Sequence, residues 1–105
     1  MRLRSRRDFA RVYRQGRRWR GQGFSLIFHG NGMAYSRMGV SVHRKLRGAV
    51  RRNRIKRLFR EVFRLRRELF PPEADIVVTV RPDFDLDHRD DVARAVARLD
   101  NRTRP

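Results

Sequence analysis

The stretch GAVRRNRIKRLFRE, residues 48–61, combines a dense basic face with the spacing of a buried helical stripe. It contains six arginine or lysine residues and a single acid, Glu61. At about 100° per residue, one narrow arc collects the apolar side chains of this stretch and its continuation: Ile55, Leu58, Phe59, Val62 and Leu69. The pattern predicts a long helix over residues 49–69, which Pro71 and Pro72 terminate.

The opposite side of this predicted helix is almost entirely cationic. Its residues are Arg52, Asn53, Lys56, Arg57, Arg60, Arg64 and Arg67. Like charges one turn apart destabilise an isolated helix, and a face that only meets water normally mixes the two signs. Glu61 and Glu68 are the only acids here. The face therefore indicates a ridge that binds phosphate groups, with an ordinary solvated face as the alternative.

Charge is distributed unevenly along the whole chain. Residues 1–67 hold 22 basic and two acidic residues, whereas residues 68–105 hold six basic and nine acidic ones, so +20 and −3 sum to the net charge of +17. A field of this kind attracts polyphosphate backbones. Nucleic acid is the predicted partner, and an anionic membrane surface is the competing one.

Length and composition exclude several classes of protein. A chain of 105 residues predicts one domain, residues 1–105. The absence of cysteine excludes disulfides and thiolate metal sites. No apolar run approaches the ~18 residues of a membrane span, and the N-terminus lacks the apolar stretch of a signal peptide. We therefore expect a cytoplasmic protein that does not span a membrane, with nucleic acid rather than a membrane surface as its partner.

The remaining segments predict a single compact α+β domain. In chain order they are a helix over 5–15, strands over 22–29 and 34–43, the long helix over 49–69, a strand over 75–80 and a helix over 87–99. A turn at 29–32 should return the second strand antiparallel to the first. The sequence leaves room for one further short strand, near 17–21 or 44–48.

Two groups of residues have two readings each. Phe9 and Tyr13 share a face of the first predicted helix, which suits either the core or a platform on which unpaired bases stack. In the second predicted strand, Arg37, Gly39 and Ser41 point away from the apolar face. This small, polar face is either plain surface or the floor of a groove.

No arrangement of residues predicts catalysis by the protein itself. The three histidines stand apart, and no spacing suggests a nucleophile with its base. The acidic run at 83–91 fails the calcium-loop pattern, because its sixth position is His88 and its twelfth is Arg94. Carboxylates at a helix N-terminus explain this run better.

The basic helix closely resembles the signature of the bacterial ribonuclease P protein family. In that signature an Arg-Asn-Arg motif is followed by Lys-Arg and a later Arg, here Arg52, Asn53, Arg54, Lys56, Arg57 and Arg60. The stretches DFARVYRQG (8–16), FSLIF (24–28) and MGVSVHRKLRGAV (38–50) resemble the preceding elements of the family. The resemblance covers about residues 3–99.

The resemblance implies an α-β-β-β-α-β-α fold with a central sheet. It also implies an auxiliary subunit of the endonuclease that removes the 5′ leader from precursor tRNA. In this family the RNA subunit and its Mg²⁺ ions perform the chemistry, so the protein alone would bind no metal and cleave nothing. The expected partners are the catalytic RNA, in a 1:1 complex with a monomeric protein, and precursor tRNA. The alternatives are a structural RNA-binding protein of ribosomal type and, third, a free-standing nuclease.

The resemblance also assigns residues. The Arg-Asn-Arg helix face, together with Arg64, is expected to bind the RNA subunit. Phe9 and Tyr13 fall at the family's aromatic positions in a cleft that holds the single-stranded leader, and strand parity adds Arg37, Gly39 and Ser41. One departure concerns this cleft: Ile27 stands where some relatives have an aromatic residue. In addition, His43 and Arg44 replace the usual Ser or Lys.

Overall fold

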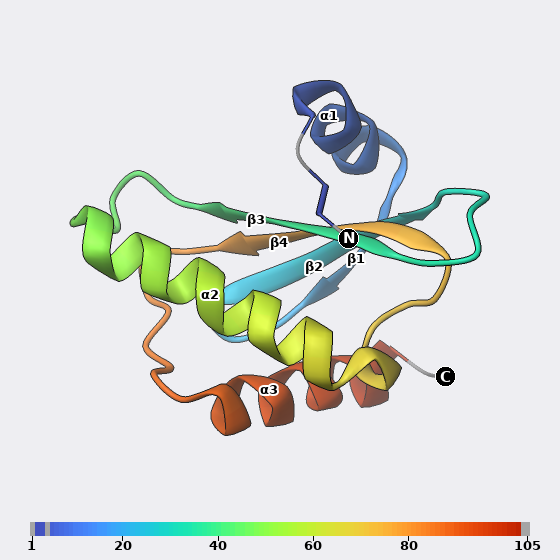
Figure 1. Ribbon diagram of the computed structural model, residues 1–105. Coiled ribbons are helices and arrows are strands. Elements are labelled where there is room, and N and C mark those ends of the chain that lie inside the picture. The colour runs from blue at the N-terminus through green and yellow to red at the C-terminus, as the bar shows by residue number, and fades with distance from the viewer. Residues whose placement is uncertain (1, 4, 104–105) are drawn as a thin grey trace.

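A four-stranded sheet with helices on both faces forms the described part of the chain (Figure 1). The computed structural model describes residues 2–3 and 5–103. The elements are α1 (Arg6–Gln15), β1 (Arg17–Arg20), β2 (Phe24–Gly30), β3 (Arg37–Val42), α2 (Ala49–Leu65), a 3₁₀ turn η1 (Arg67–Leu69), β4 (Ala74–Val80) and α3 (Arg89–Thr103). This order confirms the predicted α-β-β-β-α-β-α fold, and β1 is the additional short strand.

The strand order in the sheet is β1-β2-β4-β3. β4 pairs antiparallel with β2 and parallel with β3, which explains why its sequence is a nearly continuous apolar run. β3 runs antiparallel to β2, as expected, but the two strands are not paired because β4 lies between them. The loop after β2 is therefore a connection across the sheet and not a hairpin.

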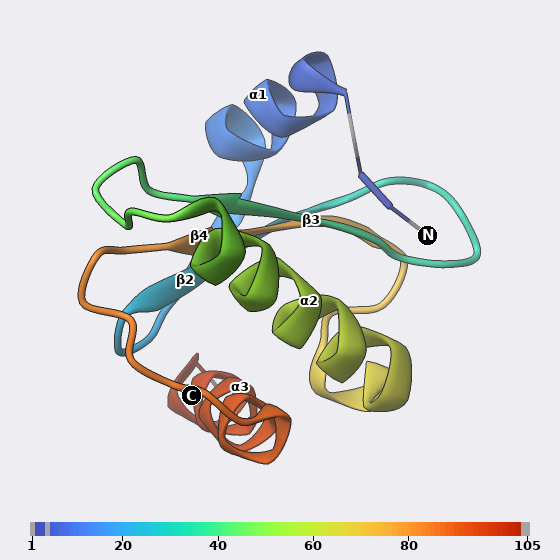
Figure 2. The same cartoon turned by 60° about the vertical axis from the view of Figure 1, so that its left-hand side comes forward.

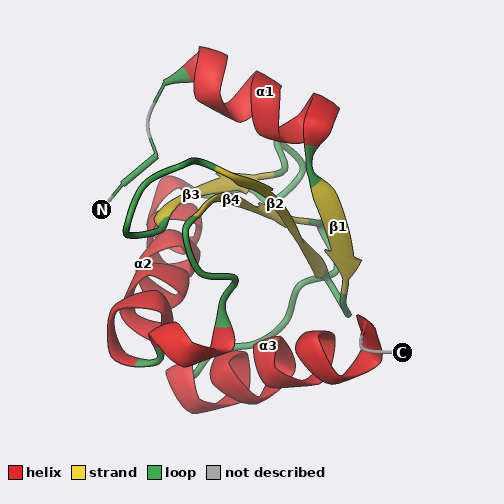
Figure 3. Ribbon diagram, turned by 90° about the vertical axis from the view of Figure 1, so that its right-hand side faces the viewer, coloured by secondary structure: helices red, strands yellow, loops and turns green. Residues whose placement is uncertain are grey.

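The main core lies between the sheet and the pair α2 and α3 (Figure 3). Phe24, Phe59 and Phe84 meet there, with ring centroids 5.2–6.1 Å apart. Val92, Val96 and Leu99 pack inward from α3. Here α3 begins later than predicted and extends to Thr103.

The long helix ends before its predicted boundary. Its last α-helical residue is Leu65, and Arg66 leaves the helical conformation with φ −132° and ψ 56°. The turn η1 then brings Phe70 against Phe63, with ring centroids 5.2 Å apart. The helix must stop here because the chain turns toward β4, whereas the prolines come only after that turn.

A second, smaller core attaches α1 to the other face of the sheet (Figure 2). It consists of Leu3, Val12, Ile27 and Val77, with Phe9 packed against them. The N-terminus of α1 is capped by Ser5, whose Oγ accepts a hydrogen bond from the backbone N–H of Arg7 (3.1 Å). None of the helices in the described residues has the length and apolar character needed to cross a bilayer.

Candidate nucleic-acid interface

The seven residues of α2 that are expected to bind the RNA subunit lie on three sides of the helix. Asn53, Arg57 and Arg64 are exposed and face outward. One flank, toward the β3 edge, carries Arg52, Lys56 and Arg60 at successive turns, each half-buried. Arg54 lies on the opposite flank, where its guanidinium is 3.5 Å from Asp87 Oδ1. We call these seven residues the basic set; they form a broad surface around α2 and not a single ridge.

Acidic neighbours cancel only part of this charge. Glu61 accepts a hydrogen bond from Arg64 (2.9 Å), which lowers the pKa of Glu61 below its ordinary value. Glu61 therefore stays ionised at neutral pH. Because α2 has no other acidic residue, the field around the basic set stays positive.

The two aromatic residues of α1 differ in their surroundings. Tyr13 is 42% exposed, so the core interpretation does not hold for it. Phe9 is half-buried against the small core. Both residues, with Arg6 and Ala10, line an open depression of about 390 Å³ on the outside of α1.

A second depression lies on the other side of Phe9. It also measures about 390 Å³, and it contains Gly39 from β3 and Arg60 from α2. Arg60, which the resemblance assigns to the RNA subunit, therefore borders the same hollow as Phe9 and Gly39 of the predicted leader cleft. The two predicted binding surfaces are contiguous at this point.

Gly39 makes room for the ring of Phe9. A Cβ added at Gly39 would lie 2.4 Å from Phe9 Cζ and 2.7 Å from the carbonyl oxygen of Leu3. The space above Gly39 is therefore filled by Phe9. Ser41, two residues further along the same face, is half-buried beside Thr79 of β4.

Arg37 belongs to a buried ionic cluster. Its Nε and Nη2 donate to the two carboxylate oxygens of Asp75 (2.8 and 2.7 Å), which is 1% exposed. Arg11 of α1 donates to the same carboxylate (2.9 Å), as does Asn31 (3.1 Å). We call Asp75, Arg37, Arg11 and Asn31 the Asp75 clamp, since it ties α1 and the loop after β2 to the sheet.

The clamp keeps its carboxylate ionised. Burial alone would raise the pKa of Asp75, but the hydrogen bonds from Arg37 and Asn31 and the charge of Arg37 outweigh it and lower the pKa below 3.8. The hydrogen bond to Asp75 likewise raises the pKa of Arg37. The guanidinium of Arg37 is bonded to Asp75, so Arg37 stabilises the structure beneath the predicted cleft and does not contact a ligand directly.

Sequence reasoning overlooked Asp75, Arg11 and Asn31. One signal was present: Asp75 stands inside the apolar run of β4, and a carboxylate in a buried strand requires partners. The identity of those partners was not accessible, because Arg11 and Asp75 are 64 positions apart in the chain.

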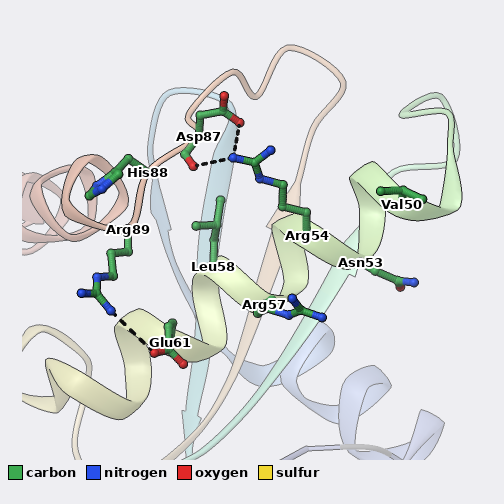
Figure 4. Close-up of a pocket in the computed structure, with 9 residues that line it drawn as sticks. All are labelled: Val50, Asn53, Arg54, Arg57, Leu58, Glu61, Asp87, His88 and Arg89. Atoms are coloured by element: carbon green, nitrogen blue, oxygen red, sulfur yellow. Dashed lines mark hydrogen bonds and ion pairs between the residues drawn. The ribbon is translucent and has the colours of Figure 1, made fainter.

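A further hollow, which we call the α2–α3 groove, opens between α2 and the segment that leads into α3 (Figure 4). Its volume is about 660 Å³, and it is lined by Val50, Asn53, Arg54, Arg57, Leu58, Glu61, Asp87, His88 and Arg89. Three of these residues belong to the basic set. The others were not singled out as binding residues by sequence reasoning. Within residues 2–3 and 5–103, no group of three histidine, aspartate or glutamate side chains is placed to hold a metal ion.

The sequence profile of the family described as Ribonuclease P matches residues 1–104 of this chain. A protein named ribonuclease P protein component, from Desulfotalea psychrophila, is 53% identical over 92 residues, which cover 88% of this chain and 77% of that protein. The protein of the same name from Thermotoga maritima is 44% identical over 80 residues, or 76% of this chain and 68% of its own.

Solved structures resemble the fold closely. The ribonuclease P protein of Thermotoga maritima superposes with a TM-score of 0.83 at 37% identity, covering 100% of this chain and 99% of that one. The ribonuclease P protein of Staphylococcus aureus gives a TM-score of 0.81 at 27% identity, covering 98% and 94%. Sequence and fold therefore point to the same family.

Proposed function

Because the chain belongs to the ribonuclease P protein family, we propose that it assists the catalytic RNA in removing the 5′ leader from precursor tRNA. The family makes it the protein component of a tRNA-processing enzyme. The observation that supports the proposed role most directly is the basic set on α2, which is rich in exposed cations beside a well-packed core. The protein acts in the cytoplasm, as a monomer bound 1:1 to the RNA.

The basic set binds the phosphate backbone of the RNA subunit. Arg57 and Arg64 face outward, and Arg52, Lys56 and Arg60 extend the same surface toward the β3 edge. Arginine pairs with phosphate through two parallel hydrogen bonds, which fixes orientation as well as contributing affinity. A surface that spans three sides of a helix suits a folded RNA with phosphates on several strands.

The leader binds beside α1, where Tyr13 offers an exposed ring and Phe9 a half-buried one. Stacking on aromatic rings depends little on base identity, which suits an enzyme that meets many different leaders. Ser41 contributes a polar floor, while Gly39 and Arg37 act indirectly, through Phe9 and the Asp75 clamp.

The chemistry belongs to the RNA subunit, which holds the catalytic Mg²⁺. The protein contributes cations that screen the repulsion between the phosphates of enzyme RNA and substrate. It therefore lowers the Mg²⁺ concentration at which the RNA subunit cleaves.

Reconstitution tests this function. Purified protein should leave precursor tRNA intact, and it should reduce the Mg²⁺ requirement of the ribonuclease P RNA from the same organism. Cleavage by protein freed of all RNA would identify a nuclease instead. Failure to bind or stimulate this RNA, combined with tight binding to ribosomal RNA, would favour the structural RNA-binding protein.

Arg57→Ala should weaken binding to the RNA subunit and flatten its dependence on salt. Loss of one phosphate contact reduces the slope of log K against log salt by about 0.7 to 1. The measurement is a binding titration at several salt concentrations. Arg98→Ala on α3 is the matched control, because Arg98 is also exposed but lies outside the basic set. An Arg57→Ala protein with the affinity and slope of the control would contradict the assignment.

Tyr13→Ala should weaken binding of precursor tRNA about tenfold, in line with the value of one stacked base. The loss of affinity should increase as the leader is lengthened up to about eight nucleotides. Binding of mature tRNA, which has no leader, should not change. Tyr13→Phe should retain most of the affinity because it keeps the ring. Tyr35→Ala removes a tyrosine of similar exposure in the loop before β3 and should have no effect. A loss of affinity in Tyr13→Ala that is equal at every leader length would show that Tyr13 does not contact the leader.

A further inference from the structure

We propose that the α2–α3 groove receives one unpaired base of the RNA subunit, seated over Leu58 and stacked on the guanidinium group of Arg89. This inference rests on the proposed function, since the partner is the same RNA. It adds a base-binding site to a surface that the family resemblance describes only as a set of cations.

The floor and walls of the groove suit a flat ring. Leu58 is half-buried at its centre, between an Arg54–Asp87 pair on one side and an Arg89–Glu61 pair on the other (Figure 4). Each pair spans from α2 to the segment around the start of α3. Arginine guanidinium groups are planar and stack on bases, and an apolar floor excludes water from the ring face.

The charges of the groove favour a nucleotide over other ligands. Its two acids, Glu61 and Asp87, each lie within ion-pair distance of an arginine, which neutralises part of their repulsion of a phosphate. Three arginines against two acids leave the groove positive. A purely apolar ligand would not use the arginines, and an acidic peptide would leave the apolar floor uncovered.

Val50 adds a second apolar surface. It lies in the first turn of α2 at the edge of the groove and is 84% exposed. Single exposed apolar residues are common, but this one adjoins Asn53 of the basic set. RNA seated on α2 would cover Val50, and the amide of Asn53 offers both a donor and an acceptor to a base edge.

The position of the groove identifies which RNA supplies the base. The predicted leader cleft lies beside α1. Helix α1 covers the opposite face of the sheet from α2 and α3 (Figure 3). Asn53, Arg54 and Arg57 of the basic set line the groove directly. The base therefore comes from the RNA subunit and not from precursor tRNA.

Replacement of arginine by lysine separates stacking from charge. Arg89→Lys keeps the positive charge but loses the planar group, so binding to the RNA subunit should weaken about tenfold with an unchanged salt slope. Arg94→Lys is the matched control, because Arg94 is likewise an ion-paired arginine of α3 but lies outside the groove. Val50→Ala, at an exposed position, should also weaken binding while leaving thermal unfolding unchanged. Wild-type affinity for both Arg89→Lys and Val50→Ala would overturn the proposal.

A cross-link locates the base. The chain has no cysteine, so Val50→Cys introduces a single thiol for a photoreactive label. The expected cross-link joins an unpaired nucleotide of the RNA subunit. Removing that base should weaken binding of the wild-type protein about tenfold and that of Arg89→Lys far less.

Each other outcome has a definite meaning. Cross-links only to paired nucleotides or to precursor tRNA, or an equal effect of base removal on both proteins, would reject the groove site. If the RNA subunit binds normally and responds to Arg57→Ala, that rejection leaves the proposed function standing. Absence of any binding to the RNA subunit by the wild-type protein would instead reject the proposed function itself.

Discussion

Asp75→Ala should lower the free energy of unfolding by about 3 kcal/mol, the lower end of the range for breaking a buried ion pair. The change leaves Arg37 and Arg11 without the carboxylate that both now contact. The side chains of Arg37 and Arg11 are 20% and 42% exposed, so water partly compensates. Denaturant titration of both proteins measures the difference. Asp87→Ala is the control, because its carboxylate is 81% exposed and its ion pair contributes little.

The stabilisation by Asp75 should depend on pH with a definite sign. The folded protein holds the pKa of Asp75 below its ordinary value of 3.8. The contribution is therefore complete above that value and is lost as the pH falls through the lower, folded pKa. Asp75→Asn removes this titration, so the stability difference between wild type and Asp75→Asn should shrink as the solution is acidified below about pH 4. A difference that stays constant down to about pH 2 would show that the clamp does not depend on the charge of Asp75.

The local elements of this fold could be predicted from periodicity, but their arrangement in the sheet could not. Leu26 and Phe24 face one core and Ile27 the other, as strand alternation predicts. Nothing in the residues of β2 and β3 shows that β4, more than 30 positions later, enters between them. The order of the strands depends on how their apolar faces are brought together beneath α2, which the individual segments do not reveal. Similarly, α2 ends at Leu65, where the chain turns so that Phe70 packs on Phe63. No glycine or proline at this point predicts that the helix ends here.

The candidate site shows the same division. Motif and spacing identified the basic set, and the exposure of Tyr13 agrees with a surface role. The alternation of side chains along a strand predicted that Arg37 and Gly39 lie on the face of β3 opposite its apolar residues. It could not show that other residues of the protein already contact both of them. Arg37 is bonded to Asp75, and Gly39 lies under Phe9. The sequence identifies which residues share a face, whereas only the packing of α1 on that face decides which of them a ligand can reach.

Gly39→Ala should destabilise the protein by about 2 kcal/mol through overpacking, although it adds only one methyl group. The methyl would lie 2.4 Å from Phe9 Cζ and 2.7 Å from the Leu3 carbonyl oxygen. The ring of Phe9 can swing outward, but the backbone of Leu3 can move only with the segment before α1. Ser41→Ala, on the same face of β3, is the control for changes to this strand and should cost much less.

A double-mutant cycle connects this packing to the leader. In a Phe9→Ala background the ring no longer blocks the new methyl, so Gly39→Ala should cost less than in the wild type, by about 1 kcal/mol. The displaced ring of Phe9 should also impair binding of precursor tRNA with a long leader, while binding to the RNA subunit through the exposed Arg57 stays unchanged. Denaturant titrations and leader-length binding curves on the same four proteins measure both effects. The contrary outcomes are additive losses of stability, or a loss of binding that is the same at every leader length. Either result would show that Gly39 does not set the position of Phe9 in the cleft.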